Sequence, residues 1–128
     1  MRVKLSGLFK FIRIMAATGF AAGVLGCVAL DTRASHDRVG VRSIVAKASA
    51  FFLDTGRVPE SVDDLLNNAR QLEGWKGPYL TEAQSRNSWG HRYVIRAPGL
   101  YGDLDVVSLG ADGREGGSGR NADIGNWQ

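Results

Sequence analysis

The last twenty residues contain the side chains whose types and spacing are best suited to chemistry. Asp112 and Asp123 lie in a segment with glycines at positions 110, 113, 116, 117 and 119. Calcium takes about six to eight oxygen ligands from carboxylates and carbonyls, and glycine lets the backbone fold tightly enough to aim carbonyls inward. Spacing alone leaves two interpretations open. The segment is either a calcium-binding loop or, more simply, a flexible glycine loop with solvated aspartates.

The sequence lacks the patterns of the common enzyme classes. It has no P-loop, no G-x-S-x-G and no H-E-x-x-H motif. His36 and His91 are the only histidines and Cys27 is the only cysteine, too few for a zinc site built on either type. Ser108, His91 and Asp105 have the residue types of a catalytic triad, but their spacing does not support one. We therefore expect no enzymatic activity and no small-molecule substrate.

The net charge of +3 and the pI near 9.4 come from the N-terminus rather than from a basic domain. Four of the sixteen basic residues are Arg2, Lys4, Lys10 and Arg13. Without them twelve basic and thirteen acidic residues remain, a net charge of about −1. A nucleic-acid partner needs a concentrated basic surface. The charge distribution therefore argues against one and is typical of a membrane-flanking leader.

An uncharged stretch follows this basic leader. Residues 14–30 contain no charged side chain, and a spanning helix needs about 20 apolar residues, within a range of about 17–25. The positive-inside rule places residues 1–13 in the cytoplasm. We therefore expect two parts, a leader with a single-pass inner-membrane anchor at 1–30 and a periplasmic domain at 31–128.

Three interpretations of this N-terminus stay open. It is an uncleaved anchor, a lipoprotein signal or a prepilin leader. Val24-Leu25-Gly26-Cys27 resembles a lipobox, in which Cys27 would carry the lipid. The plainest alternative for Cys27 is a small apolar residue within a helix.

Helical periodicity opens the exported part. It predicts an amphipathic helix from about Asp37 to Leu53, ended at Thr55-Gly56, whose buried side carries Val41, Ile44, Val45, Ala48 and Phe52. A shorter helix is expected after Pro59, with Ser61 as its N-cap and a buried edge of Val62, Leu65, Leu66 and Ala69.

Strand signals follow from Gly74 onward. Residues 92–96 and 104–108 predict an antiparallel hairpin that turns at Pro98-Gly99. The segment from Gly110 to Gln128 is expected to be a glycine-rich loop. A long helix followed by a small antiparallel sheet is an α+β fold.

Several motifs, in order along the chain, resemble the type II secretion system major pseudopilin, the general secretion pathway protein G family. Gly74 to Leu80 resembles the family's WKGPYL motif, and Ser88 to Tyr93 its PWGNPY turn. Residues 108–113 (SLGADG) and 122–127 (ADIGNW) are similar to its C-terminal loop. Each motif alone is weak, but their order and spacing together are specific.

The resemblance implies a pilin-like fold, in which an N-terminal membrane helix continues into an amphipathic helix packed on a small antiparallel sheet. It implies subunits that polymerise into a short periplasmic pseudopilus, with other pseudopilin subunits and inner-membrane secretion components as partners. It also implies a calcium-binding C-terminal loop. The ligands would be the side chains of Asp112 and Asp123 and the carbonyls of Leu109 and Arg114. Asn121 would supply an amide oxygen, and Trp127 would anchor the loop.

The N-terminus departs from the family pattern. A prepilin leader ends in glycine, with a glutamate at the fifth position of the mature chain, and cleavage at Gly7 or Gly19 would place Ile12 or Val24 there. No acidic residue precedes Asp31. The alternative expectation is therefore a pseudopilin-like domain on a plain or lipid anchor that acts as a scaffold or binding module and does not polymerise.

Overall fold

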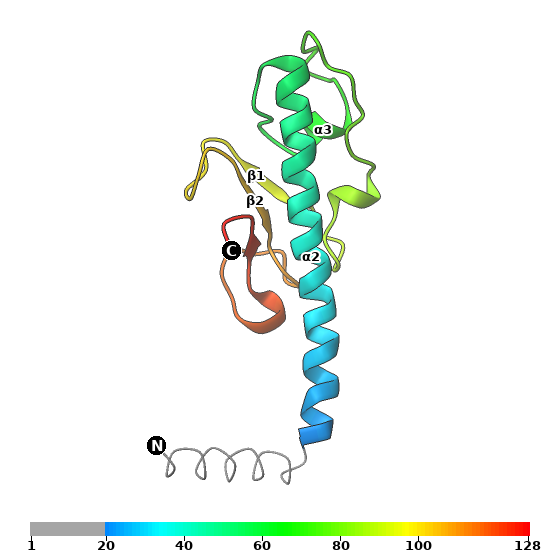
Figure 1. Cartoon of the computed structure of the whole chain (residues 1–128), viewed down its shortest axis with the longest axis vertical. Coiled ribbons are helices and arrows are strands. Elements are labelled where there is room, and N and C mark those ends of the chain that lie inside the picture. Colours follow the sequence, from blue (N-terminus) through cyan, green and yellow to red (C-terminus); the bar gives the residue numbers. More distant parts are fainter. Residues whose placement is uncertain (1–19) are drawn as a thin grey trace, which may run out of the picture. The chain divides into compact units, whose positions relative to one another are not determined.

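The structure, a computed structural model, describes residues 20–128 (Figure 1). The chain separates into two units, Met1–Thr32 and Arg33–Gln128, and the second is called the head domain below. The basic leader and the side chains of the apolar stretch, Cys27 included, lie outside the described part. None of the helices within residues 20–128 has both the length and the apolarity that a membrane crossing requires.

The long helix α2 runs over Phe20–Thr55. In the head domain it buries Val41, Ile44, Ala48 and Phe51, a spacing of three and four residues that keeps side chains on one face. The helix ends at Thr55, and the following Gly56 has a left-handed φ of 71° and donates its N–H to the Phe52 carbonyl at 2.7 Å. Its predicted C-terminus is confirmed.

One core residue of this helix was predicted wrongly. Phe52 was expected on the buried face, but its side chain is 49% exposed, whereas the preceding Phe51 is fully buried. The buried face is centred on Val41, Ile44 and Ala48. Positions three and four residues after Ala48 both lie near this face, so helical spacing does not choose between Phe51 and Phe52. Phe51 is the one that Tyr79 packs against.

The second helix, α3, is a single turn at Asp63–Leu66. Ser61 does not cap it, because the N-cap is Val62 and no side chain bonds there. Val62 and Leu65 are buried as predicted, but Ala69 is exposed. Tertiary packing rather than a cap stabilises this turn, because its buried residues pack against α2.

The sheet has three antiparallel strands in the order β1-β2-β3. β1 is Val94–Arg96, β2 is Asp105–Ser108 and β3 is Ile124–Gly125. Ile95 pairs with Val106, which confirms the predicted hairpin, and Ser108 pairs with Ile124. The sequence pattern missed β3, because two residues show no alternation. Figure 1 shows the sheet on one side of α2. The α+β fold, with one long helix and a small antiparallel sheet, is confirmed.

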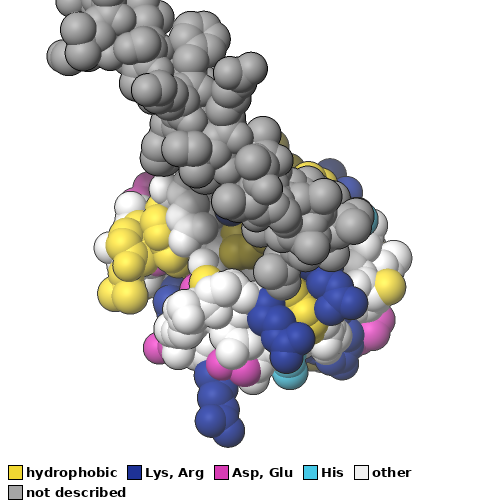
Figure 2. Space-filling model, turned by 90° about the horizontal axis from the view of Figure 1, so that it is seen from below, with side chains coloured by type: hydrophobic (Ala, Val, Ile, Leu, Met, Phe, Trp, Pro, Cys, Tyr) yellow, Lys and Arg dark blue, Asp and Glu magenta, His cyan; other side chains and the backbone are white. Residues whose placement is uncertain are grey.

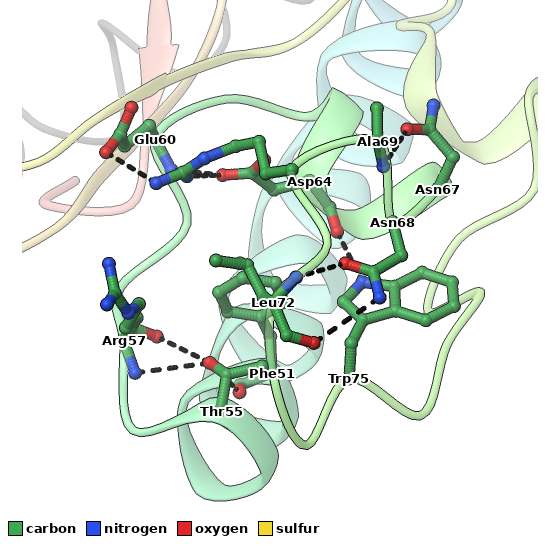
Figure 3. A network of polar contacts seen from close by, with 11 residues as sticks. Phe51, Thr55, Arg57, Glu60, Asp64, Asn67, Asn68, Ala69, Leu72 and Trp75 are labelled. Atoms are coloured by element: carbon green, nitrogen blue, oxygen red, sulfur yellow. Dashed lines mark hydrogen bonds and ion pairs between the residues drawn. The ribbon is translucent and has the colours of Figure 1, made fainter.

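One core joins these elements, and a polar network ties the segment after α3 to it (Figure 3). Trp75 Nε1 donates to the Asp64 carbonyl at 2.9 Å, and the Tyr79 hydroxyl donates to Asp54 at 2.7 Å. The Tyr79 ring lies edge-on to Phe51, with ring centres 5.7 Å apart. Gly74 has to be glycine here, because its φ is 82° and a Cβ would lie 2.1 Å from the Asp54 carbonyl oxygen. The WKGPYL segment therefore closes the C-terminal end of α2.

Candidate functional site

The loop between β2 and β3 folds back on itself through backbone contacts. The Ala111 N–H donates to the Arg120 carbonyl at 2.9 Å, and the 3-10 helix η2 at Gly119–Asn121 follows. Gly110 has a φ of 71°, and a Cβ there would lie 2.8 Å from the Asn121 carbonyl oxygen. Only glycine permits this approach. All five predicted ligand residues, Leu109, Asp112, Arg114, Asn121 and Asp123, therefore lie in or beside one tight loop.

The two aspartates of this loop are placed differently. Asp112 is exposed, and its Oδ1 accepts the Arg114 N–H at 3.1 Å. Asp123 is half-buried, and its Oδ2 accepts the Gly116 N–H at 3.0 Å. Asp123 Oδ1 is buried and has no hydrogen-bond partner among the described residues. A buried carboxylate oxygen without a partner is costly, and a bound cation would supply that partner. A calcium ion therefore fits the position beside Asp123 Oδ1.

The remaining ligands would have to be carbonyl oxygens. Within residues 32–128, whose side chains the structure describes, no three His, Cys, Asp or Glu side chains gather closely enough to hold a metal ion. Calcium also takes backbone and amide carbonyl oxygens as ligands. Gly117 permits the close approach of the two sides of this loop, because a Cβ there would lie 2.8 Å from the Asn121 carbonyl oxygen. A calcium ion here would therefore bind through two carboxylates and a majority of neutral oxygens.

His91 supports this loop, a role that the sequence did not indicate. Its Nε2 lies 3.0 Å from the Ala111 carbonyl oxygen, and a Cβ at Gly113 would lie 2.7 Å from its Nδ1. Ser108 and Asp105, the other two residues with the types of a catalytic triad, make hydrogen bonds to other groups. Ser108 Oγ donates to Asp37, and Asp105 accepts the backbone N–H groups of the loop between β1 and β2. The structure does not assemble a triad from these three residues.

Asp37 is the second residue that sequence reasoning missed. Its side chain is fully buried and accepts hydrogen bonds from Ser88 Oγ and Ser108 Oγ, both at 2.6 Å, and from the Ser88 N–H at 2.9 Å. Burial, with Asp37 nearby, raises the pKa of the Tyr93 hydroxyl well above its ordinary value. The available signal was position, because Asp37 precedes Val41 by one helical turn on the apolar face. The carboxylate links α2 to β2 and to the turn at Ser88.

Replacing this carboxylate should cost stability. Asp37→Asn replaces one of the two carboxylate oxygens, which together accept from three donors, by an NH₂ group that cannot accept a hydrogen bond. A buried donor left unbonded costs about 1–3 kcal/mol. We expect a fall of about 1–2 kcal/mol in the free energy of unfolding, measured by urea denaturation. Asp103→Asn is the matched control, because Asp103 is exposed and has no hydrogen-bond or ion-pair partner within residues 32–128. Equal losses in the two variants would contradict a special role for Asp37.

Comparison with known proteins covers both the sequence and the fold. The family model of the type II secretion system (T2SS), protein G, matches residues 29–127. The chain is 39% identical over 84 residues to the type II secretion system core protein G of Xanthomonas campestris pv. campestris, which covers 66% of this chain and 59% of that protein. It is 34% identical over 93 residues to the core protein G of Pseudomonas aeruginosa, with 68% and 66% covered.

The fold leads to the same group. The major pseudopilin from the type 2 secretion system of enterohaemorrhagic Escherichia coli aligns with a TM-score of 0.54 and 27% identity, over 71% of this chain and 86% of that one. The chain spans 59% and 66% of the lengths of the two curated relatives. Motif order, architecture and the match over residues 29–127 agree. The chain therefore belongs to the type II secretion system protein G family.

Proposed function

We propose that this protein is a structural, pseudopilin-like component of a type II secretion system that contributes to or associates with the periplasmic pseudopilus. The observation that carries this proposal is that the head domain shares its architecture with a major pseudopilin, in an alignment that covers 71% of the chain. The N-terminal segment would anchor the protein in the inner membrane by a single pass, with the head in the periplasm. Its partners would be other pseudopilin subunits and inner-membrane secretion components, and its role would not be enzymatic.

Calcium would be the cofactor of this head domain. The unpartnered Asp123 Oδ1 and the glycine-dependent folding of the loop support this proposal. The ion would bind Asp112, Asp123 and Asn121 and the carbonyls of Leu109 and Arg114. Its effect would be to fix the loop between β2 and β3 against the sheet.

A non-polymerising role is the alternative, and one observation favours it. No glutamate stands where a prepilin leader would require it, because Ile12 and Val24 occupy the two possible positions. A buried charge within an apolar fibre core needs a partner of opposite sign, and this chain offers no acidic residue before Asp31. The same head domain on a plain helix, or on a lipid at Cys27, would then act as a scaffold or binding module.

The intact mass of the membrane-extracted protein separates these possibilities. A pseudopilus subunit should lose residues 1–7 or 1–19 and carry an N-methyl group, whereas a lipoprotein should begin at Cys27 with a diacylglyceryl group. A full-length mass indicates a plain anchor and the scaffold role. Type II secretion should also fail when the gene is deleted and recover when it is returned. Normal secretion in the deletion strain would refute both roles.

A further inference from the structure

The exposed large hydrophobic side chains of the head domain gather at two places. Six such residues are exposed within the described part, and Val39 is the only one outside these two places. Leu100 and Tyr101 form the tip of the loop between β1 and β2. The other place is the C-terminal end of α2 and the segment after it, where Phe52, Leu53 and Val58 are exposed. Apolar groups gathered in this way mark contact surfaces.

The tip is held in a fixed shape. Asp105, which is buried, accepts the N–H of Leu100 at 2.7 Å and that of Tyr101 at 3.3 Å. Gly99 allows this turn, because a Cβ there would lie 2.4 Å from Asp105 Oδ1. The Tyr101 ring stacks on Trp127, with ring centres 4.1 Å apart and planes at 20°. Leu100 and Tyr101 are nonetheless 78% and 64% exposed. A preorganised tip loses little entropy on binding.

Figure 2 shows the surface that such a tip produces. In this view from below, hydrophobic side chains gather at the left edge of the head domain, the side on which Figure 1 draws the loop between β1 and β2. The tip combines an aliphatic and an aromatic side chain. Aromatic anchors of this kind account for much of the binding energy at interfaces.

The second place is a groove. Phe52, Leu53, Val58 and Leu104 line it together with Ala48 and Asp103, and its volume is about 410 Å³. The walls are mainly apolar, and Asp103 adds one carboxylate without a hydrogen-bond or ion-pair partner within residues 32–128. The Tyr101 hydroxyl is a donor that such a carboxylate can accept. The tip and the groove therefore match each other in apolar character and in their one polar pair.

We infer that the tip of one copy inserts into the groove of the next copy, as a head-to-head contact between neighbouring subunits of an assembly. The loop between β1 and β2 carries the tip and also supplies Asp103 and Leu104 to the groove, but the tip and the groove are different surfaces. A contact between two different surfaces is heterologous, and repeated heterologous contacts generate closed rings or open fibres. The inference rests on the proposed function, because it requires copies held side by side.

The size of the contact argues against a freely diffusing partner and for an occupant that other contacts already hold nearby, as a second copy would be. One leucine and one tyrosine bury roughly 300–400 Å², whereas a self-standing interface needs about 1,000 Å². A freely diffusing partner would not be retained by this tip alone. Copies already held together by other contacts lose little further translational and rotational freedom when the tip inserts, because the insertion is then intramolecular within the assembly.

Cysteine pairing between differently tagged copies tests the contact. Full-length Leu100→Cys and Leu53→Cys chains are co-expressed with different tags, and their membranes are oxidised with copper phenanthroline. A mixed disulfide joining positions 100 and 53, identified by mass spectrometry of the linked peptides, is expected. Val39→Cys replaces Leu53→Cys as the matched control, because Val39 is exposed outside both surfaces. In otherwise unaltered chains, Leu100→Asp should reduce assembly about tenfold or more.

The outcomes separate this inference from the proposed function. Fibres seen by electron microscopy without the disulfide between 100 and 53, or equal pairing with Val39→Cys, would overturn the tip-and-groove contact and leave the pseudopilus role standing. Assembly unaffected by Leu100→Asp would also overturn it. Absence of both fibre and disulfide would show that copies do not associate and would overturn the contact, whereas the proposed function fails only if type II secretion is also normal in the deletion strain.

Discussion

Calcium is expected to raise the melting temperature of the head domain, and Asp123→Asn is expected to remove that rise. Asp123 Oδ1 is buried without a partner among the described residues, so an ion that fills this position relieves an unfavourable charge. A ligand at a hundredfold excess over its Kd stabilises the folded state by about 2.7 kcal/mol. For a domain of this size that free energy corresponds to roughly 10 °C or more.

The measurement is differential scanning calorimetry of residues 33–128 in calcium and in chelator. Asp123→Asn keeps the shape of the side chain and an oxygen for the Gly116 N–H, so loss of the calcium effect would report the missing charge. Asp112→Ala should remove the effect as well, while Asp103→Asn should retain it. Equal melting curves in calcium and chelator for the unaltered domain would refute the calcium site.

Phe51→Ala should cost the head domain about 3–5 kcal/mol of unfolding free energy, the usual range for a buried phenylalanine. Phe51 is fully buried and packs edge-on against Tyr79, which in turn bonds to Asp54 and lies edge-on to Trp75. Its removal opens a cavity at the point where α2 and the WKGPYL segment meet. A loss of this size approaches the whole stability of a small domain.

Phe52→Ala is the matched control, since the same residue type stands one position later and is 49% exposed. Its loss should be about 1 kcal/mol or less. Urea denaturation followed by tryptophan fluorescence measures both variants, and the slope m checks that each transition stays comparable. Equal costs, or a larger cost for Phe52→Ala, would mean that the buried face of α2 is assigned wrongly.

The local patterns predicted much of the fold. Apolar residues three and four apart placed the long helix and its end at Gly56, and β-branched residues around Pro98-Gly99 placed the hairpin. Both signals come from neighbours along the chain, so they need no knowledge of what the elements pack against. The motifs indicated the family for a similar reason. WKGPYL and the C-terminal loop are each contiguous in sequence, so they can be recognised without knowing what they pack against.

Long-range packing decided the rest. Phe51 rather than Phe52 enters the core because Tyr79, 28 positions later in the chain, lies against it. Asp37 is buried only because Ser88 and Ser108 supply its hydrogen bonds, and β3 exists only where β2 offers an edge.

The loop at Asp112 and Asp123 is the strongest chemical signal in the sequence, and here too sequence and tertiary structure each supplied a part of the candidate site. The sequence by itself determined the oxygen donors and the glycines that allow a tight turn. Only the tertiary structure showed that one oxygen of Asp123 is buried without a partner among the described residues. Desolvation depends on atoms that are distant in sequence, and no local spacing reveals it.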